Sequence, residues 1–175
     1  MRPIVLKGEK ISLGILLKED LQKSWEWFND RSTVRHLFNS AHFTLPEEEE
    51  EFYEELKKNK DKTPTFAVIE NETGKLVGIA GSNWINWQAR WAEILYYLAP
   101  EERGKSYGTE VVRLLCEYAF RHLNLHKVWA KVHEDNKASI RVLEKNGFTL
   151  SGRFREHVWS DERYIDELIY ERFKL

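Results

Sequence analysis

The sequence predicts a single domain over residues 1–175 of the mixed α/β (α+β) class, with helices on both faces of one mixed sheet. Strand-like apolar runs alternate with helical patterns, and two pairs of runs are close enough to form hairpins. No repeat, linker or low-complexity segment divides the 175 residues. A chain of this length can bury most of its apolar surface without disulfides.

Turn and helix signals define the elements of the first half. Thr44 and Glu47 have the spacing of a capping box, which marks the start of a helix. The turn Asn71-Glu72-Thr73-Gly74 separates two β-rich runs and predicts a hairpin. The expected elements are the strand Ile11 to Leu17, the helix Glu19 to Asn29, a loop with one further helical turn from Arg31 to Phe43, the helix that begins at Thr44, and the strands Thr65 to Glu70 and Lys75 to Trp84.

The second half ends in another hairpin. Ile140 and Leu143 lie three apart on one face of a short helix that begins near Asn136, and Gly147 stops it. The expected elements are the strand Trp91 to Leu98, the long helix Tyr107 to Leu123, the strand Val128 to His133, a helix over 137–146, and the strands Thr149 to Trp159 and Arg163 to Phe173, turned near Ser160-Asp161-Glu162.

A glycine-containing loop joins an apolar strand to the long helix. It reads Arg103-Gly104-Lys105-Ser106-Tyr107-Gly108-Thr109. The first turn of a helix has N–H groups without intrahelical partners at the positive end of the helix dipole, and a phosphate satisfies them. Glycine lets a ligand approach the backbone, while Arg103 and Lys105 add positive charge. The loop therefore predicts a pyrophosphate site, with a plain strand-to-helix turn as the alternative.

Several stretches of the chain share a pattern with one known family. They are Trp27-Phe28-Asn29-Asp30, the run Glu47 to Phe52, Arg90-Trp91-Ala92-Glu93-Ile94, the loop Arg103 to Glu110, Tyr118-Ala119-Phe120, the helix start Asn136 to Ser139, and Glu144 to Phe148. Together they resemble the GCN5-related N-acetyltransferase (GNAT) family, in particular its branch of ribosomal-protein N-terminal alanine/serine acetyltransferases and spermidine acetyltransferases. The resemblance covers nearly the whole chain. It implies a central, mostly antiparallel sheet of about seven strands.

The resemblance implies acetyl-CoA as the donor. In this family the strand before the loop splays from the strand after the long helix, and the pantetheine arm inserts into the gap. By position, main-chain groups of Tyr96, Tyr97 and Leu98 would bond the arm. Asn136 matches a cofactor-contacting asparagine, although it also suits a helix N-cap. Ser106 replaces a family glycine, and we expect binding to survive if its backbone angles are ordinary. The residues expected at the pyrophosphate are Arg103, Gly104, Lys105, Ser106, Tyr107, Gly108 and Thr109.

The resemblance also suggests catalytic groups. Glu93 is the expected base that removes a proton from the acceptor amine; the alternative is a structural carboxylate paired with Arg90. Leu143 stands where many relatives have a tyrosine acid, which favours the ribosomal-protein branch. Ser139 is the expected proton donor to the departing sulfur, against an ordinary first-turn serine or no acid at all.

Other groups stay open as participants. Tyr96 and Tyr97 are further candidates for the acid, and His133 is either a proton relay or a packed histidine. The run Glu47 to Glu51 favours a solvated helix face over an acidic lip for a basic acceptor. Among the aromatic side chains, most should be core, while Trp84 and Trp87 flank a loop and could line a substrate groove.

The expected function is acetyl transfer to a primary amine by direct attack in a ternary complex, with a protein N-terminal amine as the leading acceptor. The alternatives are a small amine (a polyamine, amino acid or antibiotic) and a non-catalytic acyl-CoA-binding module, which Ser106 and Leu143 keep open. By analogy with the family, the segments Arg31 to Phe43 and Trp159 to Glu162 shape the acceptor groove. The oligomeric state is open, a homodimer included.

Composition excludes several other classes. The single cysteine, Cys116, excludes an internal disulfide and is expected to be a core thiol. No metal-ligand cluster is visible in the sequence, so no metal is expected. The net charge of -2 gives no general attraction to nucleic acid. The apolar runs are too short to span a bilayer and the N-terminus lacks a signal peptide, so a cytoplasmic protein without membrane partners is expected.

Overall fold

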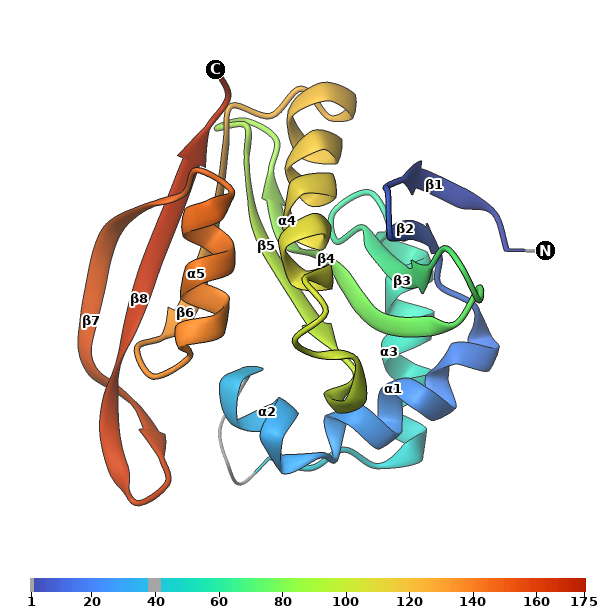
Figure 1. The fold of residues 1–175 in the computed structure, drawn as a ribbon, viewed down its shortest axis with the longest axis horizontal. Coiled ribbons are helices and arrows are strands. Elements are labelled where there is room, and N and C mark those ends of the chain that lie inside the picture. The colour runs from blue at the N-terminus through green and yellow to red at the C-terminus, as the bar shows by residue number, and fades with distance from the viewer. Residues whose placement is uncertain (1, 38–41) are drawn as a thin grey trace.

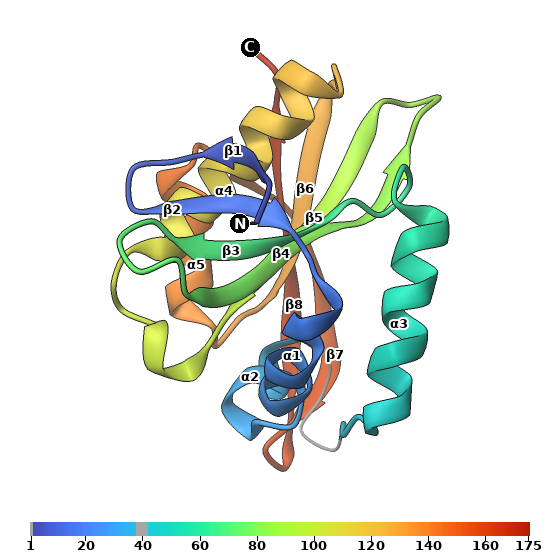
Figure 2. The ribbon, with the colours of Figure 1, turned by 90° about the vertical axis from the view of Figure 1, so that its right-hand side faces the viewer.

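One sheet runs through the protein, with helices on both of its faces (Figures 1 and 2). The computed structural model describes residues 2–37 and 42–175, and within them the sheet has eight strands in the order β1-β2-β3-β4-β5-β6-β8-β7. Neighbouring strands are antiparallel except β5 and β6, which are parallel. The strands are β1 (Ile4–Lys7), β2 (Ile11–Ile15), β3 (Thr65–Glu70), β4 (Leu76–Asn86), β5 (Trp91–Leu98), β6 (Lys127–His133), β7 (Thr149–Ser160) and β8 (Arg163–Phe173).

The described helices connect these strands. They are α1 (Leu21–Phe28), α2 (Arg31–Leu37), α3 (Pro46–Asn59), α4 (Tyr107–Glu117) and α5 (Lys137–Lys145). After Glu117 the long helix continues as a π-helical turn over Tyr118–His122. None of the helices within the described ranges combines the length and the apolarity needed to cross a membrane.

The predicted mixed sheet with helices on both faces is confirmed. The strand β1 was not expected, and it makes the sheet one strand wider than predicted. A full helix α2 replaces the expected single turn, while residues 38–41 of that predicted loop lie outside the described residues. The predicted start of α3 is one residue early, because Leu45 is the N-cap and its N–H donates to Glu48 (2.6 Å).

The glutamate run at the start of α3 is only partly a solvated face. Four of its five side chains are exposed, but Glu49 is only 3% exposed. Burial raises the pKa of Glu49, while a hydrogen bond to Ser24 on α1 acts against the rise. The expectation of a fully solvated run is therefore wrong at Glu49, which packs between α3 and α1.

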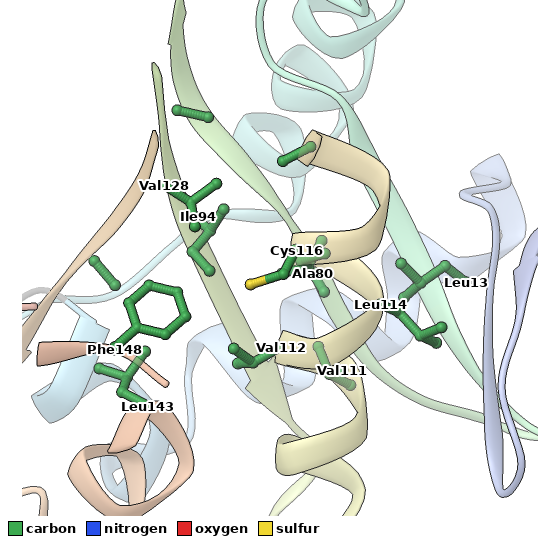
Figure 3. Close-up of a cluster of buried hydrophobic side chains, with 14 of the residues drawn as sticks. Leu13, Ala80, Ile94, Val111, Val112, Leu114, Cys116, Val128, Leu143 and Phe148 are labelled. Carbon is green, nitrogen blue, oxygen red and sulfur yellow. The ribbon is translucent and has the colours of Figure 1, made fainter. Parts of the chain in front are cut away.

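Each face of the sheet has its own core, because neighbouring residues of a strand point to opposite faces. Val68 packs on the side of α4 and α5, whereas Ala67 packs on the side of α1 and α3. Figure 3 shows the first core, where Cys116 and Val112 of α4 meet Phe148 and Leu143. Burial raises the pKa of Cys116 to about 11, which fits the expected core thiol.

The sheet parts between β5 and β6. Only three residue pairs join these strands, Trp91–Lys127, Ala92–Val128 and Glu93–Trp129. On the other side of β5, the pairing with β4 has a β-bulge between Ser82 and Trp84, next to Glu93. A bulge bends its strand and increases the local twist. The later residues of β5 stay paired with β4 while they diverge from β6, so a gap opens beyond Glu93.

Candidate active site

A cleft of about 1280 Å³ begins where β5 parts from β6 and continues to the N-terminus of α4. Its wall comes mainly from β4, β5, β6, α2, α3, the first turns of α4 and the length of α5, with single residues of β3 and β8. The wall contains every site residue expected from the sequence except Lys105: Glu93, Tyr96, Tyr97, Leu98, Arg103, Gly104, Ser106, Tyr107, Gly108, Thr109, Asn136 and Ser139.

The loop before α4 presents backbone N–H groups to this cleft. No side chain caps the helix at Ser106, so the first-turn N–H groups of α4 keep their capacity to bind an anion. Gly104 and Ser106 both have left-handed backbones, with φ angles of 81° and 68°. The angles of Ser106 are therefore not ordinary, and the loop makes a serine adopt a conformation that favours glycine.

The two cations of this loop already have protein partners. The Arg103 guanidinium donates to the hydroxyl groups of Ser32 (2.8 Å) and Thr33 (2.5 Å) on α2. Lys105 pairs with the buried Glu102 at 2.6 Å and does not line the cleft. Arg103 thus ties the loop to α2, and the sequence prediction that places Lys105 at the site receives no support from the side-chain geometry.

Asn136 is the N-cap of α5. Its side-chain oxygen accepts the N–H of Ser139 at 3.2 Å, so the capping role considered from the sequence is confirmed. Asn136 and Ser139 both line the cleft as well. Leu143 is 2% exposed and belongs to the core, so this chain has a packing residue where a tyrosine acid was considered.

Glu93 lies at the point where the sheet opens. Its side chain is 14% exposed, and its carboxylate is 3.6 Å from the ammonium group of Lys131 on β6. Arg90, the partner considered from the sequence, instead donates to the backbone carbonyl of Asn124. Glu93 and Lys131 face each other across the two diverging strands, and both line the cleft.

Tyr96 and Tyr97 point to opposite faces of β5. The Tyr97 hydroxyl is 3.1 Å from the Ser24 hydroxyl, within the core beneath α1. The Tyr96 hydroxyl is hydrogen bonded to Ser139 at the start of α5, and its ring lies over the first turn of α4. A Cβ at Gly108 would be only 3.2 Å from that ring, so Gly108 makes room for Tyr96.

Burial raises the pKa of both tyrosines, which keeps both hydroxyl groups protonated at neutral pH. Only Tyr96 holds that proton on the face of the sheet that carries α4 and α5. Strand alternation predicts opposite faces for the pair, but only tertiary packing shows which hydroxyl group meets Ser139 and which meets Ser24.

The two segments expected to shape the acceptor groove meet in the structure. Asp161, in the turn between β7 and β8, pairs with Arg31 (3.2 Å) and Arg35 (3.0 Å) of α2. Trp84 lines the cleft and is 51% exposed, which fits its expected place in a groove wall. Trp87 is also exposed but is absent from the wall.

Sequence reasoning missed His36 and Asp135, which lie beside His133 at the α2 side. His36 and His133 both line the cleft, and Asp135 follows His133 in the turn before α5. His133 is 4% exposed, so its packed placement is confirmed, while its role as a proton relay stays a hypothesis. His36 and Asp135 are too far apart in the sequence to form a motif, and only the fold brings them together.

Comparison with known proteins gives consistent matches. The model of the acetyltransferase (GNAT) domain matches residues 15–149. A spermidine N(1)-acetyltransferase of Vibrio cholerae is 27% identical over 91% of this chain and 90% of its own length. The crystal structure of the spermidine N-acetyltransferase from Vibrio cholerae with CoA and spermine superimposes with a TM-score of 0.87, at 25% identity over 95% of this chain and 96% of that one.

A ribosomal L7/L12 α-N-protein acetyltransferase, RimL, in complex with coenzyme A has the same fold. Its TM-score is 0.86 at 18% identity, and the match covers 97% of both chains.

Proposed function

Since this chain belongs to the acetyltransferase (GNAT) family and is an N-acetyltransferase that uses acetyl-CoA, we propose that its acceptor is the α-amine of a protein or peptide N-terminus. The observation that carries this proposal is the charge balance of the cleft. Three carboxylates line it, and each already has a basic neighbour: Glu55 with Lys58 (2.9 Å), Glu93 with Lys131 (3.6 Å) and Glu167 with His157 (3.8 Å).

The cleft wall has more cationic than acidic side chains. Six lysines and arginines line it: Arg35, Lys62, Arg103, Lys131, Arg141 and Lys145. Such a wall suits the phosphates of coenzyme A, but it repels an acceptor with several ammonium groups. An N-terminal amine has a single positive charge followed by neutral backbone, and it loses that charge before it attacks.

The donor would be held by backbone groups. Beyond Glu93, β5 has main-chain groups that face the gap and are not paired with β6. The amides of a pantetheine arm can pair with them, with Tyr96, Tyr97 and Leu98 as the expected partners. The pyrophosphate would then meet the free N–H groups at the start of α4. A main-chain N–H directed at the thioester carbonyl would stabilise the charge of the tetrahedral intermediate.

Glu93 is the proposed base. It lies at the mouth of the gap, where the thioester carbon would be presented, and the ammonium group of Lys131 is 3.6 Å from its carboxylate. The carboxylate takes one proton from the ammonium group of the acceptor, directly or through water. The neutral nitrogen then attacks the thioester carbon, and a C–N bond forms as the C–S bond breaks.

The hydrogen-bonded hydroxyl groups of Tyr96 and Ser139 are the proposed proton source for the sulfur. Tyr96 keeps its proton because burial raises its pKa, and Ser139 fixes the position of the phenol oxygen. The departing thiolate of coenzyme A takes this proton and becomes the free thiol, and the second proton, which the nitrogen loses as the amide forms, restores the donor hydroxyl.

The test measures release of coenzyme A thiol against N-terminal peptides, polyamines and amino acids. We expect peptide-dependent release that falls by about 100-fold or more in Glu93→Gln, the usual contribution of a general base. Glu171→Gln is the matched control. Glu171 pairs with Lys127 (3.1 Å), which lies on β6 like Lys131, but Glu171 does not line the cleft. Equal losses in the two variants, or turnover with polyamines alone, would contradict the proposal.

A polyamine is the second candidate acceptor. The 27% identity to a spermidine N(1)-acetyltransferase over 91% of this chain supports it. A polyamine would need the carboxylates of the cleft more than a peptide would. Glu55→Gln and Glu167→Gln should therefore raise the KM for spermidine strongly if this reading holds, and leave the KM for a neutral peptide nearly unchanged.

A further inference from the structure

Three metal-ligating side chains meet at the α2 side of the cleft. His36 lies one residue before the end of α2, His133 is the last residue of β6, and Asp135 is in the turn before α5. One ligand atom from each residue lies within 4.8 Å of the other two, and His36 Nδ1 is 3.7 Å from Asp135 Oδ1. These residues belong to segments far apart in the sequence, so the sequence showed no metal-ligand cluster.

Each of the three residues has a buried ligand-type atom without a hydrogen-bond partner. His36 Nδ1, His133 Nδ1 and Asp135 Oδ1 are all among the buried side-chain atoms left unsatisfied in the described part of the chain. A buried polar atom without a partner costs free energy, and most such atoms in folded proteins find one. Three of them, on side chains whose ligand atoms gather within 4.8 Å, indicate a missing positively charged partner.

The ring of His133 has a backbone neighbour outside the cluster. The backbone of Arg35 contacts the His133 side chain by a hydrogen bond, while His133 Nδ1 has no partner. A histidine that donates its N–H to a carbonyl oxygen keeps the lone pair of its other nitrogen free. This arrangement is typical of metal-bound histidines, because the outer hydrogen bond fixes the ring and its tautomer.

The charges around the cluster allow a cation. Metal ligation uses the neutral form of imidazole, which is the main form of an ordinary histidine near pH 7. Arg35 (2.9 Å) and Arg163 (3.7 Å) contact the other oxygen of Asp135, Oδ2, and leave Oδ1 free. The negative charge of Glu167 acts on His133. The carboxylate of Asp161 lies 3.0 Å from the guanidinium group of Arg35 and offsets its positive charge.

We propose that His36, His133 and Asp135 form a binding site for Zn²⁺ or a similar borderline transition-metal ion. Imidazole and carboxylate ligands in a tetrahedral arrangement are what zinc prefers, with bonds of about 2.0–2.2 Å. Ligand atoms at the corners of such a tetrahedron are about 3.3 Å apart, so closing the present cluster requires small side-chain rotations. Mg²⁺ and Ca²⁺ prefer oxygen ligands and are excluded.

The bound ion would join α2 to the start of α5. Both histidines line the cleft, so the fourth coordination position faces it and is open to water or to a group of the acceptor. A zinc ion held there would fix the α2 wall of the cleft next to Asn136. The inference concerns metal binding alone and does not depend on which amine is acetylated.

The test titrates metal-free, tag-free full-length protein with ZnCl₂ by calorimetry, with elemental analysis after gel filtration. We expect one Zn²⁺ per chain, a higher midpoint of thermal unfolding that EDTA reverses, and no saturable binding of Mg²⁺. Replacing Zn²⁺ by Co²⁺ should give the intense visible absorption of a tetrahedral site instead of the weak bands of hydrated cobalt.

His36→Gln and Asp135→Asn are the deciding variants, since both side chains are partly exposed and the replacements are polar and similar in size. Each should lower the affinity for Zn²⁺ by about 100-fold, since even residues behind the ligands commonly contribute 10- to 100-fold. His122→Gln, an exposed histidine of the π-helical turn, is the control and should bind like the parent. Unchanged Zn²⁺ affinity in both deciding variants, or no saturable binding in the parent, would overturn the proposal.

Discussion

The adjacent tyrosines of β5 provide a paired test of the proposed proton donor. Tyr96→Phe and Tyr97→Phe each remove one hydroxyl group from neighbouring residues with opposite orientations. The Tyr97 hydroxyl bonds Ser24 at 3.1 Å on the side of α1, whereas the Tyr96 hydroxyl bonds Ser139 at the cleft. The two variants should therefore affect different properties of the enzyme.

Tyr97→Phe should affect stability alone. Loss of one buried hydrogen bond costs about 1 kcal/mol, which lowers the unfolding midpoint of a domain of this size by about 2–4 °C. Its kcat should stay within about twofold of the parent, because the hydroxyl lies on the opposite side of the sheet from α4 and α5.

Tyr96→Phe should affect turnover. A positioned general acid contributes about 10²- to 10⁴-fold, and we expect the lower end because a coenzyme A thiolate leaves readily without help. A 100-fold loss of kcat corresponds to about 2.7 kcal/mol of barrier. The KM for acetyl-CoA should change little, since the expected contacts of the donor with this strand are made by the backbone.

The assay is steady-state thiol release at saturating peptide, beside thermal unfolding of each variant. Ser139→Ala in the Tyr96→Phe background should cause little further loss, because the two hydroxyl groups act as one hydrogen-bonded unit. A Tyr96→Phe enzyme that keeps more than half of the parent kcat would refute the assignment. So would an equal loss of kcat in Tyr97→Phe.

Two further predictions concern stability. Ser106 has a φ of 68°, and a left-handed backbone penalises any residue with a Cβ, so Ser106→Gly should be more stable than Ser106→Ala by about 1 kcal/mol. At a position with ordinary backbone angles the alanine variant would be the more stable of the two. Chemical denaturation that ranks the alanine variant first would therefore exclude the left-handed loop. Burial raises the pKa of Glu49 above its ordinary value of 4.5, so the native state binds the proton more tightly than the unfolded state does. The protonated group therefore stabilises the fold below about pH 4.5, and this stabilisation is lost as the pH rises through the native pKa. Glu49→Gln should therefore be more stable than the parent at pH 7, by on the order of 1 kcal/mol. The difference in stability should shrink in unfolding titrations repeated toward pH 4.5. A difference that does not vary with pH would contradict a raised pKa of Glu49.

Local signals were sufficient for most of the fold. The strand β5 has the predicted bounds, Trp91–Leu98, because Pro100 and the following glycine-containing loop end a clear apolar run. The hairpin of β3 and β4 follows from its turn at 71–74. By contrast, the four residues of β1 are mostly exposed and do not alternate between buried and exposed side chains. The strand depends on its pairing with β2, so its own sequence gave no strand signal.

The site was predictable where it consists of contiguous backbone. The loop before α4 and the N-cap Asn136 are recognisable because their conformation as helix starts depends on local sequence. The partners of side chains were not, since Lys131, rather than the nearby Arg90, faces Glu93 across the sheet. The conformation of Ser106 and the burial of Glu49 likewise depend on packing against distant segments.

The short contact between β5 and β6 gives the sheet internal edges in addition to its outer ones. An exposed strand edge is a template on which another chain can add, and proteins usually protect such edges with charge, proline or a cover. Here the inner edges face a cleft whose walls include α2, α4 and α5, and these helices are a cover of that kind. The same unpaired backbone that would promote aggregation at the rim of a sheet is therefore safe in its interior.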